Sequence, residues 1–213
     1  GRSAEPRVVS DARAGILHIS NDAEPKSLDP ALLVGVPEAR IMWALYEGLT
    51  TLDPETLEVI PGVAESWEVS EDGLRYTFRL RDTTWSNGDP LTAEDFVFAW
   101  RRMLTPSVAS PYAYMLYCLK NAGAFNKGEL TDASAVGVRA VDARTLEVEL
   151  AQPTPYFLTM HIHYTWFPLN RQAIEAHGAI DDPANPWTIR GPMPSNGPMK
   201  LPEWAPNRII RTV

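Results

Sequence analysis

The stretch from Trp85 to Val97 reads WSNGDPLTAEDFV and decides the fold, because it holds the end of a strand, a turn and the start of a helix without a break. Asn87 and Gly88 tolerate positive φ and Pro90 fixes its own φ, so the chain reverses direction here. Thr92 stands three residues before Asp95, which is close to the spacing of a capping box. The Asp95 carboxylate would then face the positive end of the helix dipole.

The segments on either side of this turn have different periods. Before it, apolar and polar residues alternate from Leu74 to Arg81, which predicts a strand with one face on a core and the other in water. After it, apolar residues recur at helical spacing, which predicts a helix from Ala93 to Met103. Together they form a strand-turn-helix unit, and periodicity alone assigns it no chemistry.

The rest of the chain reads as a loop-rich mixture of short strands and helices. The 19 prolines fall mostly between periodic segments, which favours an α+β plan over a helical bundle. Trp67 and Trp85 flank strands rich in apolar partners, so we expect both in the core. Beyond the unit above, we expect strands at 15–20, 57–60, 64–69, 136–142, 145–150, 198–204 and 208–213, helices at 37–48, 112–119, 122–128, 156–160 and 171–177, and a proline-rich loop at 179–194.

Charge and composition narrow the range of partners. Lys and Arg total 19 against 27 Asp and Glu, and the net charge of −8 disfavours nucleic acid and anionic membranes as partners. The single cysteine, Cys118, rules out an internal disulfide, and its apolar neighbours favour a packed thiol. No span approaches the roughly 20 apolar residues of a membrane helix. The first twenty residues also lack the apolar region of a signal peptide.

The sequence holds no arrangement typical of an enzyme or a metal centre. A Gly-x-Ser-x-Gly elbow, a P-loop and a His-Glu-x-x-His pair are all missing. His161 and His163 would point the same way on a strand, yet no third donor stands near them in the sequence. The lone His18 suits a packed or surface position better than a ligand. We therefore expect no catalytic residues, no bound metal and no cofactor.

A family resemblance rests on the strand-turn-helix unit and on motifs that follow in order along almost the whole chain. Residues 76–97 resemble the signature of the extracytoplasmic solute-binding proteins that serve oligopeptide and dipeptide ABC importers. Each motif alone is weak evidence, whereas their order and spacing together are specific. Gly35–Glu38 and Ser110–Tyr112 most resemble the oligopeptide-binding branch. The supporting motifs are SLDP (27–30), GVPE (35–38), EGL (47–49), PGVAESW (61–67), ASPY (109–112), PYF (155–157) and SNGP (195–198).

The resemblance implies an α/β fold with mixed sheets (α+β) of the periplasmic-binding-protein-like type II. Residues 1–49 would form the first part of a principal lobe, 50–168 an inserted α+β domain with its own sheet, and 169–213 the return to the principal lobe. Family members are much longer than this chain, which ends at Val213 inside a predicted strand. We therefore expect a fragment that carries one lobe and lacks the second.

The resemblance also implies a function. Proteins of this kind capture oligopeptides outside the cytoplasmic membrane and deliver them to the permease subunits of an ABC importer. Short peptides and the permease are thus the implied partners, without covalent chemistry, and the implied location is periplasmic or extracytoplasmic. The export signal would lie outside this chain. Because only one wall of the binding site would be present, we expect the isolated chain to bind peptide weakly or not at all.

Candidate ligand-binding residues come from two short motifs. Pro37 pushes Val36 towards an extended conformation, and Gly35 lets another backbone approach, so Val34, Gly35 and Val36 can form an edge on which a peptide adds as a strand. The residues equally allow a simple connector with Pro37 at the start of a helix. The resemblance favours the binding edge. It also favours a pocket role for Tyr112, whose ring and hydroxyl suit varied side chains.

Two other classes of function remain open from the sequence. The same fold could bind another solute, such as an oligosaccharide or a metal chelate, and seven tryptophans leave sugar stacking possible. Alternatively, this lobe could serve as a sensory or chaperone module that contacts a protein partner. Acrylamide quenching of tryptophan fluorescence that sugar relieves would indicate the first, and a stable protein complex without a small ligand would indicate the second.

Overall fold

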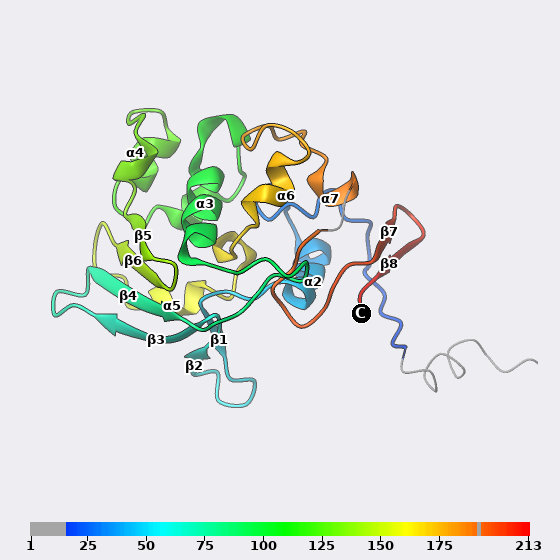
Figure 1. The fold of residues 1–213 in the computed structure, drawn as a ribbon, viewed down its shortest axis with the longest axis horizontal. Coiled ribbons are helices and arrows are strands. Elements are labelled where there is room, and N and C mark those ends of the chain that lie inside the picture. The colour runs from blue at the N-terminus through cyan, green and yellow to red at the C-terminus, as the bar shows by residue number, and fades with distance from the viewer. Residues whose placement is uncertain (1–15, 191–192) are drawn as a thin grey trace, which may run out of the picture.

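The computed structural model describes residues 16–190 and 193–213. An antiparallel sheet of four strands occupies one end of the molecule, with α3 (Ala93–Leu104) packed against it, and α2 (Val36–Leu45) lies towards the other end (Figure 1). The described part is therefore a mixed α and β structure, as the sequence predicts.

The four-stranded sheet confirms the alternation seen before the turn. Its strands are β3 (Ala64–Val69), β4 (Arg75–Leu80), β5 (Val138–Asp142) and β6 (Thr145–Glu149), in the order β3-β4-β6-β5. Along β4, the side chains of Tyr76, Phe78 and Leu80 are buried, while the alternate residues face outward. All four strands lie between residues 64 and 149, so one continuous part of the chain forms the sheet.

Helix α3 begins where the capping motif predicts. The Thr92 backbone N–H donates to the Asp95 carboxylate at 2.7 Å, which satisfies a donor at the helix start. Burial is the main reason that the pKa of Asp95 is raised, and the hydrogen bonds from Thr92 act in the opposite direction. On its inner face the helix buries Phe96, Val97 and Trp100. Local capping and the apolar stripe therefore agree on the same helix.

We expect Asp95→Ala to lower the free energy of unfolding by about 1 kcal/mol, because the change removes the acceptor of the Thr92 N–H. Urea denaturation followed by circular dichroism would measure the loss. Glu94→Ala is the matched control, since Glu94 is an exposed acid of the same helical turn. Equal stabilities of the two variants would contradict a capping role for Asp95.

The remaining elements are short and lie around the sheet and α3. Figure 1 shows the β1–β2 hairpin projecting from the body and the β7–β8 hairpin at the opposite end from the sheet. They are β1 (Thr50–Leu52), β2 (Val59–Pro61), α4 (Ala122–Asn126), α5 (Phe157–Met160), α6 (Arg171–Glu175), α7 (Trp187–Arg190), β7 (Glu203–Ala205) and β8 (Ile209–Arg211), with 3-10 turns η1 (Pro106–Val108), η2 (Ala113–Leu116), η3 (Ala133–Ala135) and η4 (Tyr164–Trp166).

An aromatic centre joins the sheet to α3, α5 and η4. The His161 ring is fully buried and stacks on Trp100 with ring centroids 6.0 Å apart. Phe78, Phe157 and Trp166 surround the same ring edge-on. Burial lowers the pKa of His161 to about 3, so this histidine is neutral over the whole physiological range. His161 is therefore a core residue.

A buried ion pair ties α3 to two distant segments. Both Asp29 carboxylate oxygens accept from the Arg102 guanidinium, at 2.9 and 2.7 Å. The indole N–H of Trp187 donates to the same carboxylate at 2.9 Å, and Arg102 also donates to the Ile180 carbonyl. Asp29 and Arg102 are each only 3% exposed. The buried ion pair therefore connects the segment at Asp29, helix α3 and the segment from Ile180 to Trp187.

Several sequence predictions need correction. Residues 16–20 form no strand, and Leu17 is 80% exposed, because no strand of the described residues pairs with them; Gly15 lies outside those residues. The proline-rich loop contains α7, since Trp187 docks in the core. The helix predicted at 112–119 is only the short 3-10 turn η2. The strand predicted at 198–204 shortens to β7, so that Pro198 and Pro202 lie outside it.

The backbone at Val36 also differs from expectation. Val36 is the first residue of α2 and is not extended, because its helical turn closes with a bond from the Ala39 N–H to the Gly35 carbonyl. Pro37 takes the first turn of the helix, where a missing N–H does no harm. Residues 34–37 thus connect a loop to the start of a helix, as the alternative interpretation of the sequence has it. The side chains exposed to a ligand there are Val34 and Val36.

Candidate functional site

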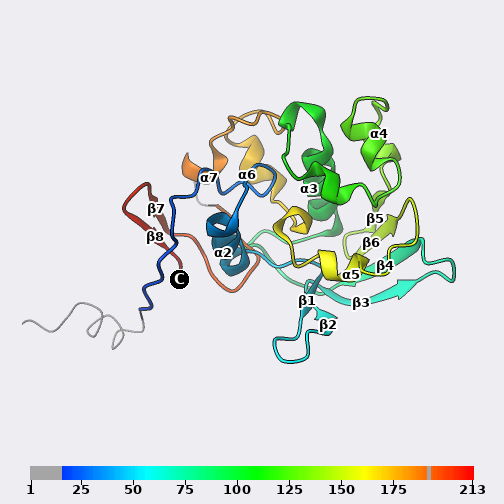
Figure 2. The ribbon, with the colours of Figure 1, turned by 180° about the vertical axis from the view of Figure 1, so that it is seen from behind.

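The turn at Ile162–Tyr164 brings three separate segments together. The indole N–H of Trp43 donates to the Ile162 carbonyl at 3.0 Å. The His163 ring meets Tyr112 edge-on, and the Tyr164 hydroxyl makes a long hydrogen bond of 3.5 Å to the Leu33 carbonyl. Figures 1 and 2 both show α2 beside the chain that follows α5. This turn is therefore the structural centre of the candidate site.

The segment at Gly35 is held in a conformation open only to glycine. Gly35 has φ +122° and ψ 171°, and a Cβ atom built there would lie 3.0 Å from Oε2 of Glu38. Glu38 itself is buried and accepts the Lys26 backbone N–H, which fixes the loop before the helix. Val34 and Val36 remain 50% and 59% exposed. The loop thus presents two apolar side chains on either side of a bare glycine.

An aromatic cluster connects Tyr112 to this loop. Its ring is half-buried at the start of η2, with centroids 6.1 Å from the Tyr164 ring and 6.0 Å from the Tyr114 ring. Burial raises the pKa of Tyr164, and the neighbouring Tyr112 adds to the effect, so the Tyr164 phenol stays protonated as a donor. Tyr112 and Gly35 therefore both lie close to one buried tyrosine.

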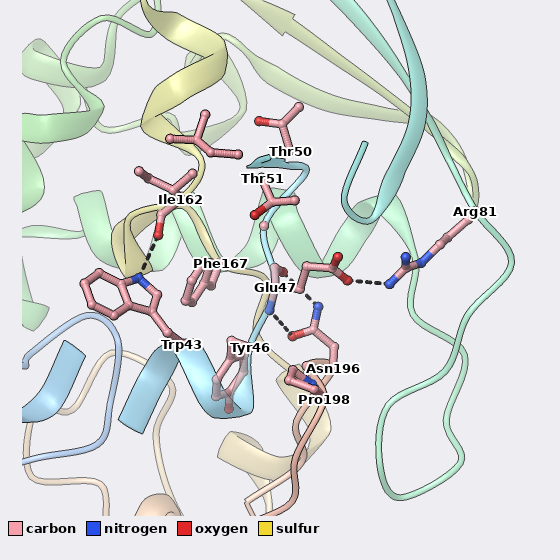
Figure 3. A pocket seen from close by; sticks show the side chains of 13 residues that line it. Trp43, Tyr46, Glu47, Thr50, Thr51, Arg81, Ile162, Phe167, Asn196 and Pro198 are labelled. Atoms are coloured by element: carbon pink, nitrogen blue, oxygen red, sulfur yellow. Dashed lines mark hydrogen bonds and ion pairs between the residues drawn. The ribbon is translucent and has the colours of Figure 1, made fainter. Parts of the chain in front are cut away.

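A cavity of about 650 Å³ opens beside this turn and beyond α2 (Figure 3). Its size falls within the range of small-ligand sites, about 300 to 1,000 Å³. Trp43, Ile162 and Phe167 form its apolar side, as Figure 3 shows. Trp43 is 52% exposed, although its neighbour Met42 is fully buried. The other lining residues are Tyr46, Glu47, Gly48, Thr50, Thr51, Leu52, Arg81, Asn196, Gly197 and Pro198.

The polar groups that line this cavity form hydrogen bonds and an ion pair with one another. Glu47 forms an ion pair with Arg81, and the Asn196 side chain both donates to the Glu47 carbonyl at 2.9 Å and accepts the Glu47 N–H at 3.2 Å (Figure 3). Burial is the main reason that the pKa of Glu47 is raised, and Arg81 opposes this effect. The Glu47–Arg81 pair and the Asn196 amide therefore make this wall neutral overall.

The segment around Asn196 is locked onto the end of α2. The Gly197 N–H donates to the Leu45 carbonyl at 2.8 Å, and a Cβ on Gly197 would lie 2.7 Å from the backbone of Leu45 and Tyr46. The Tyr46 hydroxyl donates to the Pro194 carbonyl. Only glycine permits so close an approach of two backbones. The cavity is thus built where residues 43–52 meet residues 194–198.

The predicted ligand-binding residues fall into one neighbourhood. Val34, Gly35 and Val36 lie next to Leu33, whose carbonyl accepts from Tyr164, and Tyr112 contacts the same tyrosine. The sequence reasoning missed Trp43 and Tyr164. One signal was available, because Trp43 stands seven residues after Val36 and therefore on the same face of the helix.

His161, His163 and Cys118 are the residues for which the sequence raises metal or thiol chemistry. Among residues 16–190 and 193–213, no three His, Cys, Asp or Glu side chains converge as a metal would require. His161 and His163 do not lie on a strand, and His161 faces the core. Burial raises the pKa of Cys118 to about 11, which fits the expected packed thiol. Within the same described residues, every helix is too short or too polar to cross a bilayer.

Comparison with known proteins assigns the family. The family model described as bacterial extracellular solute-binding proteins, family 5 Middle, matches residues 58–213. The chain belongs to this family. As a family 5 solute-binding protein it stands among binding proteins and not among enzymes. The resemblance drawn from the Trp85–Val97 signature is therefore confirmed.

Curated relatives match nearly the whole of this family 5 chain. The periplasmic oligopeptide-binding protein OppA of Escherichia coli is 40% identical over 210 residues, which cover 96% of this chain and 37% of the relative. The Escherichia coli protein named as a probable deoxycholate-binding periplasmic protein, YgiS, is 38% identical over 98% of this chain and 39% of its own length. The chain thus spans little more than a third of these relatives.

Solved structures show the same partial coverage of the family 5 fold. The chain superposes on Haemophilus influenzae OppA in complex with the peptide RPPGFSPFR with a TM-score of 0.82 and 38% identity, covering 91% of this chain and 37% of that one. It superposes on the unliganded open form of the murein tripeptide-binding protein MppA with a TM-score of 0.80 and 37% identity, covering 89% and 36%. The mixed α and β fold described above is therefore part of the OppA and MppA fold.

Proposed function

We propose that this chain is part of an oligopeptide-binding protein that captures short peptides outside the cytoplasmic membrane and delivers them to the permease of an ABC importer. The observation that carries the proposal is the superposition on a peptide-bound OppA along nearly the whole chain. Several curated relatives with similar identity are also named for oligopeptides, murein peptides or dipeptides. Function here is binding and release, without bond chemistry.

Val34, Gly35 and Val36, together with Tyr112, are the proposed peptide contacts. An extended peptide has backbone donors and acceptors that must be satisfied when it is buried, and protein main chain can satisfy them whatever the peptide sequence. Gly35 has no side chain to hold a peptide backbone away, and Val34 and Val36 are exposed beside it. Tyr112, whose ring contacts Tyr164, would form the wall of a neighbouring side-chain pocket.

The proposed division of the chain follows the sequence boundaries. Residues 1–49 and 169–213 would belong to a principal lobe and residues 50–168 to an inserted domain. Support comes from the links between residues 44–47 and 194–199, which bring the two outer segments together. In the whole protein, closure of a second lobe over the peptide would bury it and create a shape that the permease can recognise.

A second cargo class is kept as a competitor because one relative is named for deoxycholate. That relative is nearly as similar to this chain as OppA is. Cargo can therefore differ on one fold, and the choice must be tested by direct titration. An oligosaccharide or a metal chelate would be further outcomes of the same test.

Titration followed by two-dimensional NMR tests the proposal with the isolated chain. Tri-alanine added to millimolar concentration is expected to shift the resonances of Val34, Gly35, Val36 and Tyr112, with an affinity weaker than micromolar because one wall alone contacts the peptide. Micromolar or tighter binding would contradict the expectation of a single wall. Shifts with deoxycholate or an oligosaccharide, and none with any peptide, would overturn the peptide proposal.

A further inference from the structure

We propose that the cavity beside Trp43 is a specificity pocket for an uncharged aromatic or large aliphatic side chain of the bound peptide, about three residues along from the residue that contacts Gly35. This inference rests on the proposed function, since it assumes that a peptide lies at Gly35. It adds a pocket that is separate from the Gly35 and Tyr112 contacts, and it names the side-chain chemistry that the pocket accepts.

The apolar side of the cavity is pre-organised. Trp43 is 52% exposed, yet its ring is fixed by the hydrogen bond from its indole N–H to the Ile162 carbonyl. A rigid, exposed aromatic ring loses little conformational entropy when it contacts a ligand, which is why such rings often serve as anchors in binding sites. Phe167 and Ile162 continue this surface into the cavity (Figure 3). An aromatic or aliphatic side chain therefore finds apolar contacts on several sides.

The polar side of the cavity favours a neutral occupant. The Glu47 carboxylate is already paired with Arg81, and Asn196 uses both ends of its amide on the Glu47 backbone. A charged side chain would have to compete with one partner of the existing ion pair and would lose water on entry. An apolar side chain disturbs neither the ion pair nor the amide bonds.

The distance from Gly35 to the cavity matches an extended peptide. Val36 and Trp43 are seven residues apart in α2, on one exposed face of the helix. At 1.5 Å per residue their separation along the axis is about 10 Å. An extended peptide advances about 3.3 Å per residue, so about three residues cover this length. A peptide that starts at Gly35 and follows α2 thus places a side chain at the cavity.

A position scan tests the pocket directly. The isolated chain would be titrated with penta-alanine and with five variants that carry one phenylalanine at each position, followed by NMR of the backbone amide and tryptophan indole N–H groups. One position is expected to tighten binding by about tenfold, equivalent to about 1.4 kcal/mol, and to shift the Trp43 and Ile162 resonances. A matched lysine scan is expected to give no such gain at any position.

Two substitutions test whether Trp43 is responsible for the gain in affinity. Trp43→Ala is expected to reduce the affinity for the best phenylalanine peptide to that of penta-alanine, whereas Tyr156→Ala is expected to keep the gain. Tyr156 is the matched control because its ring is also exposed and does not line the cavity. Circular dichroism would establish that both variants fold. If Trp43→Ala does not fold, the phenylalanine scan on the unsubstituted chain alone decides whether the pocket exists.

The outcomes separate this inference from the proposed function. A flat phenylalanine scan, with penta-alanine still shifting Gly35 and Tyr112, would overturn the pocket and leave peptide binding intact. If millimolar peptide shifts no resonance of Val34, Gly35, Val36, Tyr112 or Trp43, the proposed peptide contacts on this wall and the pocket are both overturned. A deoxycholate titration that shifts the Trp43 indole when no peptide does would assign the cavity to another ligand and overturn the inference.

Discussion

Replacing Arg102 with alanine is expected to lower the free energy of unfolding by about 3 to 5 kcal/mol, because it leaves the Asp29 carboxylate buried without its cation. Asp29 would keep the Trp187 indole and the Ala31 N–H as donors, but no positive charge. The Ile180 carbonyl would also lose its donor. Urea denaturation would measure the loss as a fall in the midpoint at an unchanged slope.

The matched control for this substitution is an ion pair on the surface. Arg139→Ala breaks the pair with Glu147, in which the Arg139 side chain is 64% exposed, and is expected to cost no more than about 1 kcal/mol. Removing both buried charges, with Asp29→Asn and Arg102→Leu together, should cost less than the sum of the single changes. A loss for Arg102→Ala no larger than that for Arg139→Ala would show that the buried pair is not an anchor.

His161 is expected to make the protein sensitive to acid. Its pKa is about 3 in the folded chain against an ordinary value of 6.5, so below pH 6.5 the unfolded chain binds a proton that the folded chain excludes. Stability from this group is therefore complete above about pH 6.5 and is lost progressively towards pH 3. The total loss is about 4 to 5 kcal/mol at 1.36 kcal/mol per pKa unit.

His161→Leu isolates this effect. The Thr50 hydroxyl donates to the Leu158 carbonyl and contacts His161 Nδ1, while Nε2 is buried without a partner among the described residues. An apolar side chain therefore fits the surrounding rings. The stability of the variant relative to the unsubstituted chain should rise steadily as the pH falls from about 6.5. Phe125→Leu, a core substitution that changes no titratable group, should show the same pH dependence as the unsubstituted chain. Equal slopes for all three proteins would contradict the prediction.

The local parts of the fold were predictable from the sequence, and the parts set by distant contacts were not. The β4 alternation and the Thr92–Asp95 cap are properties of adjacent residues, and both are confirmed. Residues 16–20 have strand-like composition, yet a strand needs a pairing neighbour. Helix α7 lies among prolines and holds its place because Trp187 reaches Asp29 from 158 residues away. No local pattern contains that information.

The candidate site was predictable only as separate motifs. The residues at Gly35 and at Tyr112 each suggested contact with a ligand, but nothing in the sequence joins them. Their link is Tyr164, a buried residue between two histidines and a run of aromatics that reads as ordinary core. Trp43 reads as one more apolar residue of α2. Its exposure follows from a cavity whose other wall comes from residues 196–198.

The contacts of α2 also impose an order of assembly. The hydrogen-bond partner of Trp43 is Ile162, which is 119 residues later in the chain. The partner of the Leu33 carbonyl is Tyr164, which is 131 residues later. During synthesis from the N-terminus, the hairpin of β3 and β4 can pair soon after it leaves the ribosome, whereas α2 emerges earlier and acquires its partners much later. Residues 33–45 are thus made before their partners and are among the last of the described segments to dock.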